Sequence, residues 1–332
     1  MSDEVIEKTF QVSAPARLII SNVRGSVIIQ PGEADVIEVK AARHGNFDSG
    51  RNVVEMTQDT DGSVRVETRS NDALFGFLSH PPRVDYSVRV PQGIHLEASC
   101  ISSTLNVSGL EGTFKLKTIS GNVELVKLSG PFKLGAVSGD ITGSQMTGVL
   151  DLNTVSGRVR MTESGFPSAS ASTVSGDLFL QTPVSEGPYH FSSVSGSVRM
   201  VVPADTRCNV ELNSVSGSIR SSLPATATSM GHGLKVTQVQ GGGTAVRLKS
   251  VSGGVSIESE GVPATTVSTT EPVPVDTIPA IPPIPPIPPI PPIPPIPTSS
   301  TSTPEPLSTA EILQRIESGE MTVDEAIKLM KE

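Results

Sequence analysis

The chain has 332 residues, which is long enough for two ordinary domains, and its formal net charge is −9. This acidic balance disfavours binding to nucleic acid and to anionic membranes, because their phosphates repel a negatively charged protein. Aromatic residues make up only 3% of the sequence, with no Trp, which counts against platforms that stack sugars or bases.

The first 92 residues predict a mostly antiparallel β cap. Apolar and polar residues alternate around 36–39, 53–56 and 83–90, as in strands with one buried face. The run from Gln58 to Gly62 leads into another alternating segment, which indicates a hairpin. A stack of repeats needs such a cap, because an open sheet edge recruits other strands.

A short apolar segment, Leu74–Leu78, interrupts this region. Its side chains Phe75, Phe77 and Leu78 stand between polar flanks, so they are candidates for contact with a membrane or a protein partner. The simpler interpretation is that they plug the end of the repeat stack. The sequence leaves both interpretations open.

Residues 93–260 contain a repeated unit, an aliphatic residue followed by Ser-Gly. Its steps are 18, 18, 19, 20, 21 and 36 residues. The seven units are centred on Ile119, Val137, Val155, Val174, Val194, Val215 and Val251. Apolar residues mostly stand five and three positions before this residue and four and six after it, so each unit is two short strands with one buried face. The alternation changes parity at Ser-Gly, which requires a corner, and glycine supplies the backbone freedom for it.

A single unit cannot cover its own apolar face, but stacked units can, because each strand pairs with the same strand of the next coil. The sequence therefore predicts a mainly β fold, a parallel β-solenoid resembling a β-helix, with coils about 4.8 Å apart. Its wet face would carry polar side chains: Lys115, Lys117, Glu124, Asp151, Arg158, Arg160, Arg199 and Arg220. The stretch 218–250 fits the pattern poorly and receives no assignment.

Two cysteines, Cys100 and Cys208, would lie five or six coils apart in this stack. A disulfide requires Cα atoms within about 7 Å, so free thiols are expected, which suits a reducing compartment. The N-terminus lacks a basic segment followed by an apolar one, and no apolar run approaches about 18 residues. We therefore expect no signal peptide, no transmembrane segment and a cytoplasmic location.

Residues 261–307 are predicted to be a proline-rich linker. The tract 278–297 is nearly pure Ile-Pro-Pro, which favours a polyproline II rod of roughly 60 Å. Because this helix has three residues per turn, the isoleucines share one edge. The edge could dock in an aromatic groove, but a plain spacer is the simpler interpretation.

Residues 308–332 predict a small helical hairpin. Ser308 with Glu311 and Thr322 with Glu325 form capping boxes, and apolar residues follow each at helical spacing. The apolar side chains that we expect to make contacts are Ile312, Ile316, Val323, Ile327 and Met330. A segment this short cannot build an adequate core, so it should self-associate or bind a protein partner.

The sequence shows no catalytic or metal-binding signature. The five histidines, at positions 44, 80, 95, 190 and 232, lack a second ligand at metal spacing. The serine of each unit recurs seven times, as a structural part does, and lies in no Gly-x-Ser-x-Gly motif. Asp140 and Asp177 would stand about 10 Å apart by coil spacing, which fits the carboxylate pair of an inverting glycosidase only loosely. We expect no cofactor, no metal and no enzyme activity.

The chain resembles a bacterial family of adhesin-like β-strand-repeat proteins of unknown function. The recurring Val-Ser-Gly-x-Val, the segment Asn22–Val27 and Val90-Pro91 before the first regular coil carry this resemblance. The tail 312–326 is similar to a short helical module that accompanies the domain. Some relatives belong to envelope-stress systems, so the resemblance implies a sensing or scaffolding role.

Three functions follow from these observations. The first is a non-enzymatic scaffold or binding protein with a C-terminal association module. The second is an envelope-stress sensing or regulatory component that reaches the membrane indirectly, through a partner. The third, which the scattered carboxylates disfavour, is a polysaccharide-active enzyme.

Overall fold

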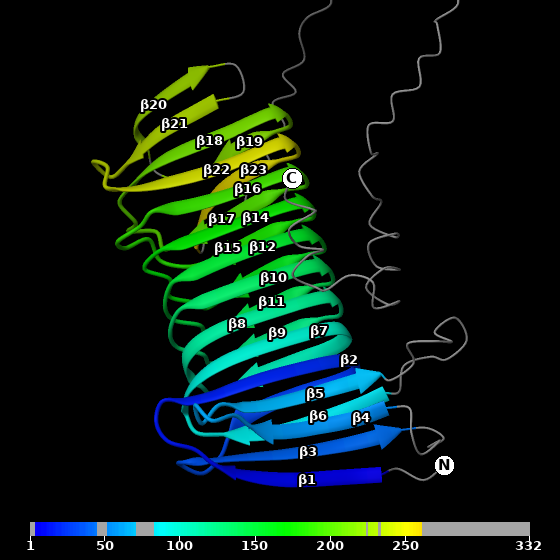
Figure 1. The fold of residues 1–332 in the computed structure, drawn as a ribbon. Coiled ribbons are helices and arrows are strands. Elements are labelled where there is room, and N and C mark those ends of the chain that lie inside the picture. Colours follow the sequence, from blue (N-terminus) through cyan, green and yellow to red (C-terminus); the bar gives the residue numbers. More distant parts are fainter. Residues whose placement is uncertain (1–3, 45–51, 71–82, 224, 232–233, 261–332) are drawn as a thin grey trace, which may run out of the picture.

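The computed structural model describes residues 4–44, 52–70, 83–223, 225–231 and 234–260. They form twenty-three strands of one sheet, which winds into a stack of coils (Figure 1). The first strands are β1 (Glu4–Gln11), β2 (Ala16–Pro31), β3 (Val36–His44), β4 (Asn52–Gln58), β5 (Val64–Ser70) and β6 (Arg83–Val90). The repeats contribute β7 (Gly93–Ser108), β8 (Glu111–Ser120), β9 (Val123–Val126), β10 (Phe132–Ser138), β11 (Ile141–Ser144), β12 (Leu150–Ser156), β13 (Val159–Thr162), β14 (Ala169–Ser175), β15 (Leu178–Gln181), β16 (Tyr189–Ser195) and β17 (Val198–Val202). The last strands are β18 (Cys208–Ser216), β19 (Ile219–Ser221), β20 (Ala225–Gly231), β21 (Leu234–Val239), β22 (Thr244–Ser252) and β23 (Val255–Ser259).

Each regular coil consists of a longer and a shorter strand joined at the Ser-Gly corner. Strand β10, for example, pairs in parallel with β8 and β12, and β11 pairs in parallel with β9 and β13. The longer strands form one wall of the stack and the shorter strands the other. The parallel β-solenoid predicted from the repeat is confirmed.

The core lies between the two walls and is made of the predicted inward positions. The residues five and three before each aliphatic residue, and four and six after it, are buried in the units for which the pattern holds, as with Leu150, Leu152, Val159 and Met161. No residue predicted for the wet face is buried. The number of residues between a side chain and the corner therefore determines whether that side chain points inward.

Side-chain hydroxyls tie the corners of adjacent coils together. The residue before the aliphatic one is buried and usually carries a hydroxyl, which can bond to a glycine carbonyl of the adjacent coil. Ser250 Oγ donates to the Gly196 carbonyl at 3.0 Å, and Ser214 Oγ to the Gly253 carbonyl at 2.9 Å. The aliphatic residue of the unit differs along the stack. Ile119 and Val137 are buried, whereas the side chains of Val174 and Val194 are about half exposed.

The coils do not stack in the order of the chain. Strand β22 pairs in parallel with both β16 and β18, and β23 pairs in parallel with both β17 and β19. The coil β22–β23 thus lies between two coils that precede it in the sequence. The assumption that each coil packs on the next one along the chain is therefore wrong at this end, and it left 218–250 without an assignment.

An antiparallel hairpin covers the far end of the stack. Strand β21 pairs antiparallel with β18 on one side and with β20 on the other (Figure 1). After this hairpin the chain turns at Gly241–Gly243 and enters β22. The hairpin satisfies the backbone groups of β18, which would otherwise be an open edge.

The N-terminal region combines antiparallel pairs with one complete coil. Strand β2 pairs in parallel with β7 along almost its whole length, and its two halves pair on the other side with β5 and β6. Strands β1, β3 and β6 are antiparallel neighbours, as are β4 and β5.

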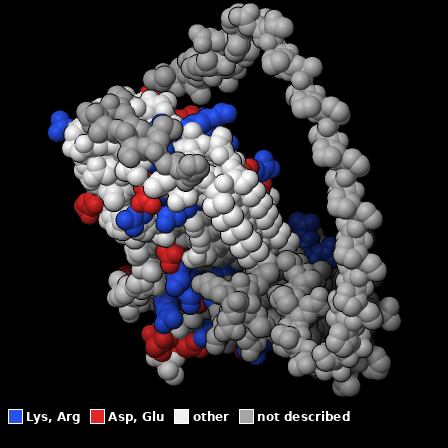
Figure 2. All heavy atoms as spheres, turned by 90° about the horizontal axis from the view of Figure 1, so that it is seen from above, with Lys and Arg blue, Asp and Glu red and all other residues white. Residues whose placement is uncertain are grey.

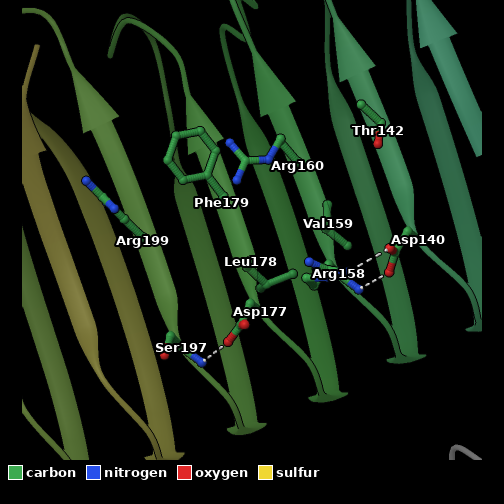
Figure 3. Close-up of a pocket in the computed structure, with 10 residues that line it drawn as sticks. All are labelled: Asp140, Thr142, Arg158, Val159, Arg160, Asp177, Leu178, Phe179, Ser197 and Arg199. Atoms are coloured by element: carbon green, nitrogen blue, oxygen red, sulfur yellow. Dashed lines mark hydrogen bonds and ion pairs between the residues drawn. The ribbon is translucent and has the colours of Figure 1, made fainter.

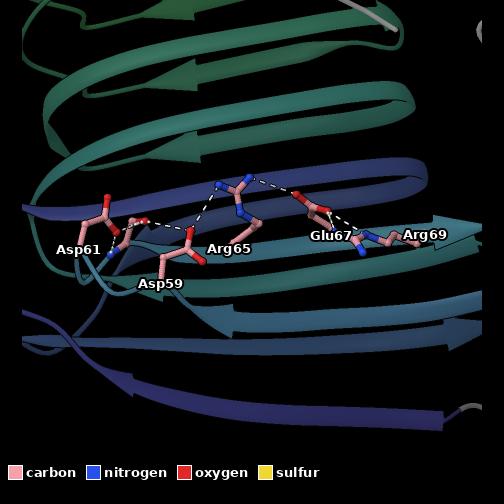
Figure 4. Close-up of polar contacts among 6 residues, drawn as sticks. Asp59, Asp61, Arg65, Glu67 and Arg69 are labelled. Carbon is pink, nitrogen blue, oxygen red and sulfur yellow. Dashed lines mark hydrogen bonds and ion pairs between the residues drawn. The ribbon is translucent and has the colours of Figure 1, made fainter. Parts of the chain in front are cut away.

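The turn between β4 and β5 is the predicted hairpin, and polar side chains order it (Figure 4). The Asp61 carboxylate accepts hydrogen bonds from the Ser63 hydroxyl and N–H, which lower the pKa of Asp61. Arg65 lies between Asp59 and Glu67, at 3.3 and 3.2 Å.

Several predicted features lie outside the described residues: the apolar segment with Phe75, Phe77 and Leu78, the proline-rich linker, and the helical hairpin with Ile312, Ile316, Val323, Ile327 and Met330. Within the described part of the chain, no helix is long and apolar enough to cross a membrane. Both cysteines are buried and free. Because β22 is inserted, the pairing path from β7 to β18 has seven steps, rather than the five or six expected.

Candidate binding groove

A shallow groove of about 460 Å³ lies on the outer face of the wall of short strands. Strands β11, β13, β15 and β17 form its floor, and the residues just after the Ser-Gly corners form one side (Figure 3). The residues that line it are Asp140, Thr142, Arg158, Val159, Arg160, Asp177, Leu178, Phe179, Ser197 and Arg199.

The centre of the groove is an aromatic ring between two arginines. Phe179 occupies the outward position between the buried Leu178 and Leu180, and the strand register places it between Arg160 and Arg199. The guanidinium carbon of Arg160 lies 4.7 Å from the ring centroid, and that of Arg199 lies 5.8 Å from it (Figure 3). Such cation–π contacts hold the guanidinium planes in defined positions.

The three arginines of the groove are not equivalent. Arg199 pairs with Glu258 on β23 at 2.6 Å, and Arg158 pairs with Asp140 at 3.3 Å. Arg160 contacts the Phe179 ring, and within the described residues it makes no ion pair. Its N–H groups are therefore available to an acceptor that enters the groove.

The two aspartates of the groove cap the corners. Asp140 accepts a hydrogen bond from the Arg158 N–H at 2.9 Å, and Asp177 accepts one from the Ser197 N–H at 2.8 Å (Figure 3). Asn122 does the same for the Asp140 N–H, at 3.2 Å. Each bond ties one coil to the next. This role accounts for both aspartates without the acid–base pair of a glycosidase.

The charges on the described surface are mixed. Lysines and arginines lie close to acidic residues when the molecule is seen from above (Figure 2). The corner next to the groove adds a line of exposed valines in successive coils, namely Val174, Val194, Val251 and Val215.

The sequence identified part of this site. Arg158, Arg160 and Arg199 were expected on the wet face, and Asp140 and Asp177 were expected two coils apart, as the strand register shows. Phe179 was missed. The signal was present, because Phe179 stands five residues after Val174, an outward position that is arginine in the neighbouring units.

The described residues show neither a cluster of metal ligands nor a reactive thiol. Among the residues that the structure describes, no three His, Cys, Asp or Glu side chains converge as metal ligands would. Burial raises the pKa of the Cys100 thiol to about 12 and that of Cys208 to about 11. Thiols in this state stay protonated at neutral pH and react slowly.

Solved structures with a similar outline are bacterial proteins of low sequence identity. A candidate adhesin from Bacteroides fragilis is 11% identical, with a TM-score of 0.45 over 77% of this chain and 97% of that one. A candidate lipid-binding protein from Parabacteroides distasonis is 12% identical, with a TM-score of 0.38 over 77% and 96%. A candidate cell adhesion protein from Clostridium sporogenes is 11% identical, with a TM-score of 0.24 over 77% and 100%.

The family assignment depends on the sequence. A comparison with curated proteins finds no match. The family model described as Toastrack DUF4097 matches residues 16–258, from the first complete coil to the end of the inserted one. This range covers most of the chain and all of the groove, so the chain belongs to the Toastrack DUF4097 family.

Proposed function

We propose that this protein is a non-enzymatic, adhesin-like binding scaffold that holds a ligand in the groove around Phe179. The observation that carries the proposal is the Arg160 guanidinium, which lies over the Phe179 ring and has no carboxylate partner among the described residues. The ring favours one orientation of the guanidinium, which reduces the side-chain entropy lost when the arginine donates hydrogen bonds to an acceptor.

The architecture around the groove supports a binding role. Each strand of its floor is hydrogen-bonded on both sides, so the side chains of the outer face keep a fixed spacing. A surface that is organised before the ligand arrives binds more tightly than one that must be ordered. Asp140 and Asp177 accept backbone hydrogen bonds at the corners, so they help to fix the shape of the groove.

A second part of the proposal concerns the C-terminal segment. We propose that residues 308–332 associate with another copy of the chain or with a protein partner. The support is the helical spacing of Ile312, Ile316, Val323, Ile327 and Met330, in a segment too short to bury these side chains by itself.

We also propose a cytoplasmic location, which the two free thiols support. Cell fractionation before and after envelope damage distinguishes this scaffold from an envelope-stress component. A pool that moves to the membrane fraction on damage would favour the envelope-stress role.

The groove can be tested with one substitution and a matched control. Phe179→Glu places a carboxylate between Arg160 and Arg199, where it should occupy both guanidinium groups. Ser192→Glu adds the same charge at an exposed position of β16, on the opposite wall. The full-length chains are passed over immobilised hyaluronate, dextran, poly-glutamate and single-stranded DNA.

We expect at least one probe to retain the wild type and the Ser192→Glu chain but not the Phe179→Glu chain. Equal retention of all three chains on every probe would show that the groove is not the binding site. The length of the recovered probe provides the second readout. A shortened probe would show cleavage and would contradict the non-enzymatic role.

A further inference from the structure

An outward row of side chains crosses the wall of short strands at the level of Phe179. The strand register aligns one residue from each coil in this row. In spatial order the row reads Glu124, Thr142, Arg160, Phe179, Arg199, Ser256 and Arg220. Arginine therefore recurs in every second coil over the last five positions.

This spacing results from the inserted coil. Along the chain, Arg199 and Arg220 belong to consecutive units, but β23 lies between β17 and β19 and places Ser256 between them. With coils about 4.8 Å apart, the three arginines stand at intervals of roughly 10 Å along the stack. The row thus extends the groove into a linear array of cationic positions.

The three arginines are available to different degrees. Arg160 and Arg220 are exposed, and within the described part of the chain neither makes an ion pair. Arg199 is held by Glu258 at 2.6 Å, so its charge is partly neutralised. Each planar guanidinium can bind a carboxylate through two parallel hydrogen bonds.

The side chains around the arginines would bind hydrogen-bond donors of a ligand rather than its anionic groups. Hydroxyls of Thr142, Ser197 and Ser256 and the carboxylates of Asp177 and Glu258 accept hydrogen bonds, and the two carboxylates repel anions. A ligand that fits this pattern carries anionic groups at wide intervals, with hydroxyl donors between them.

We infer that the row binds an extended acidic polysaccharide with carboxylates on alternate sugar units, lying along the stack axis. One sugar unit in an extended chain is about as long as one coil spacing, so carboxylates on alternate units meet Arg160, Arg199 and Arg220. The intervening hydroxyls meet the serine, threonine and carboxylate acceptors. This inference depends on the proposed binding function of the groove and specifies its ligand.

Polyanions with a charge on every unit fit less well. The carboxylates near the row and the net charge of −9 repel a dense polyanion such as nucleic acid. Single-stranded nucleic acid also needs open aromatic faces for its bases, and guanidinium groups lie over the Phe179 ring.

The test measures the affinity of the full-length chain for soluble hyaluronate, a polysaccharide with carboxylates on alternate sugars. Arg160→Ala and Arg220→Ala should each weaken binding about tenfold, since each removes a charge-assisted hydrogen-bonded pair. Glu258→Gln should strengthen binding severalfold, because it releases Arg199. Arg247→Ala on β22 of the opposite wall is the matched control and should bind as the wild type does.

Length dependence tests the linear arrangement. A hyaluronate disaccharide should be sensitive to Arg160→Ala but not to Arg220→Ala, because it cannot reach both arginines. The polymer should respond to both substitutions.

The outcomes separate this inference from the proposed function. Suppose that the chain binds dextran, that Phe179→Glu abolishes this binding and that the arginine substitutions have no effect. The acidic nature of the ligand would then be wrong, but the groove would still be the binding site. Tighter binding of poly-glutamate or single-stranded DNA than of hyaluronate would overturn the polysaccharide. Absence of hyaluronate binding, or equal affinity of wild type, Arg160→Ala and Glu258→Gln, would also overturn the inference.

Discussion

The glycine of each Ser-Gly corner is required by contact between coils. A Cβ atom on Gly157 would overlap the backbone carbonyl oxygen of Gly139 in the adjacent coil, and Gly157 has a φ of +117°. Residues other than glycine rarely adopt this backbone conformation. The close stacking of the coils and the sharp corner therefore both require glycine at this position.

Gly157→Ala should destabilise the protein by more than about 2 kcal/mol, because it adds backbone strain and displaces the adjacent coil. Gly165→Ala is the matched control. Gly165 forms a β-bridge with Thr147 in the connection between β13 and β14, and a Cβ there would meet nothing within 4 Å, so the change should stay within about 0.5 kcal/mol. Urea unfolding curves measure both values, with an unchanged slope as a check on the comparison. Equal midpoints for the two variants would contradict the proposed contact.

The inserted coil is the main feature at the scale of elements. The chain leaves β17, passes over one coil level to form β18 and β19, makes the β20–β21 hairpin and returns to fill the empty level with β22 and β23. The hairpin protects the last long strand, while the inserted coil has neighbours on both sides. The last coil in the sequence is therefore not the last coil of the stack.

Engineered cysteine pairs test the order of the coils. Ser195 lies opposite Ser252, and Ser252 lies opposite Ser216, all at exposed corner positions. Mild oxidation should therefore cross-link the pairs 195/252 and 216/252. The pair 195/216 should stay reduced, because two coil spacings, roughly 10 Å, exceed the reach of a disulfide.

Non-reducing electrophoresis after cleavage between the paired positions measures the cross-links. The native Cys100 and Cys208 are buried and serve as unreactive background. Efficient cross-linking of the pair 195/216 would show that the coils follow the order of the chain.

At the scale of the molecule, a rigid stack is followed by a long segment of different composition. The stack presents the groove on one wall, and the proline-rich linker 261–307 is predicted to separate it from the segment 308–332. We propose that this separation lets the groove bind a ligand while the end of the chain associates with another protein. Association of several copies would raise the apparent affinity for a polymeric ligand.

The association can be tested by sedimentation equilibrium of the full-length chain. Ile316→Asp combined with Ile327→Asp should convert an associated form to the mass of a single chain, because charges on the apolar helix faces oppose their burial. Gln314→Asp is the control at a polar position and should leave the mass unchanged. A single-chain mass for the wild type, or an associated mass that survives the double substitution, would contradict self-association.

The sequence alone determined which side chains point inward, where each corner lies and that glycine gives the corner its backbone freedom. These features depend on offsets of a few residues along the chain, as with Leu150 and Leu152 before the corner and Val159 and Met161 after it. Only the tertiary structure decided which coil packs on which. All units share nearly the same pattern, so any two can pair with similar satisfaction of backbone and core, and no local feature specifies the order. The row from Arg160 to Arg220 and the position of Ser256 within it follow from that order, and the sequence could not show them.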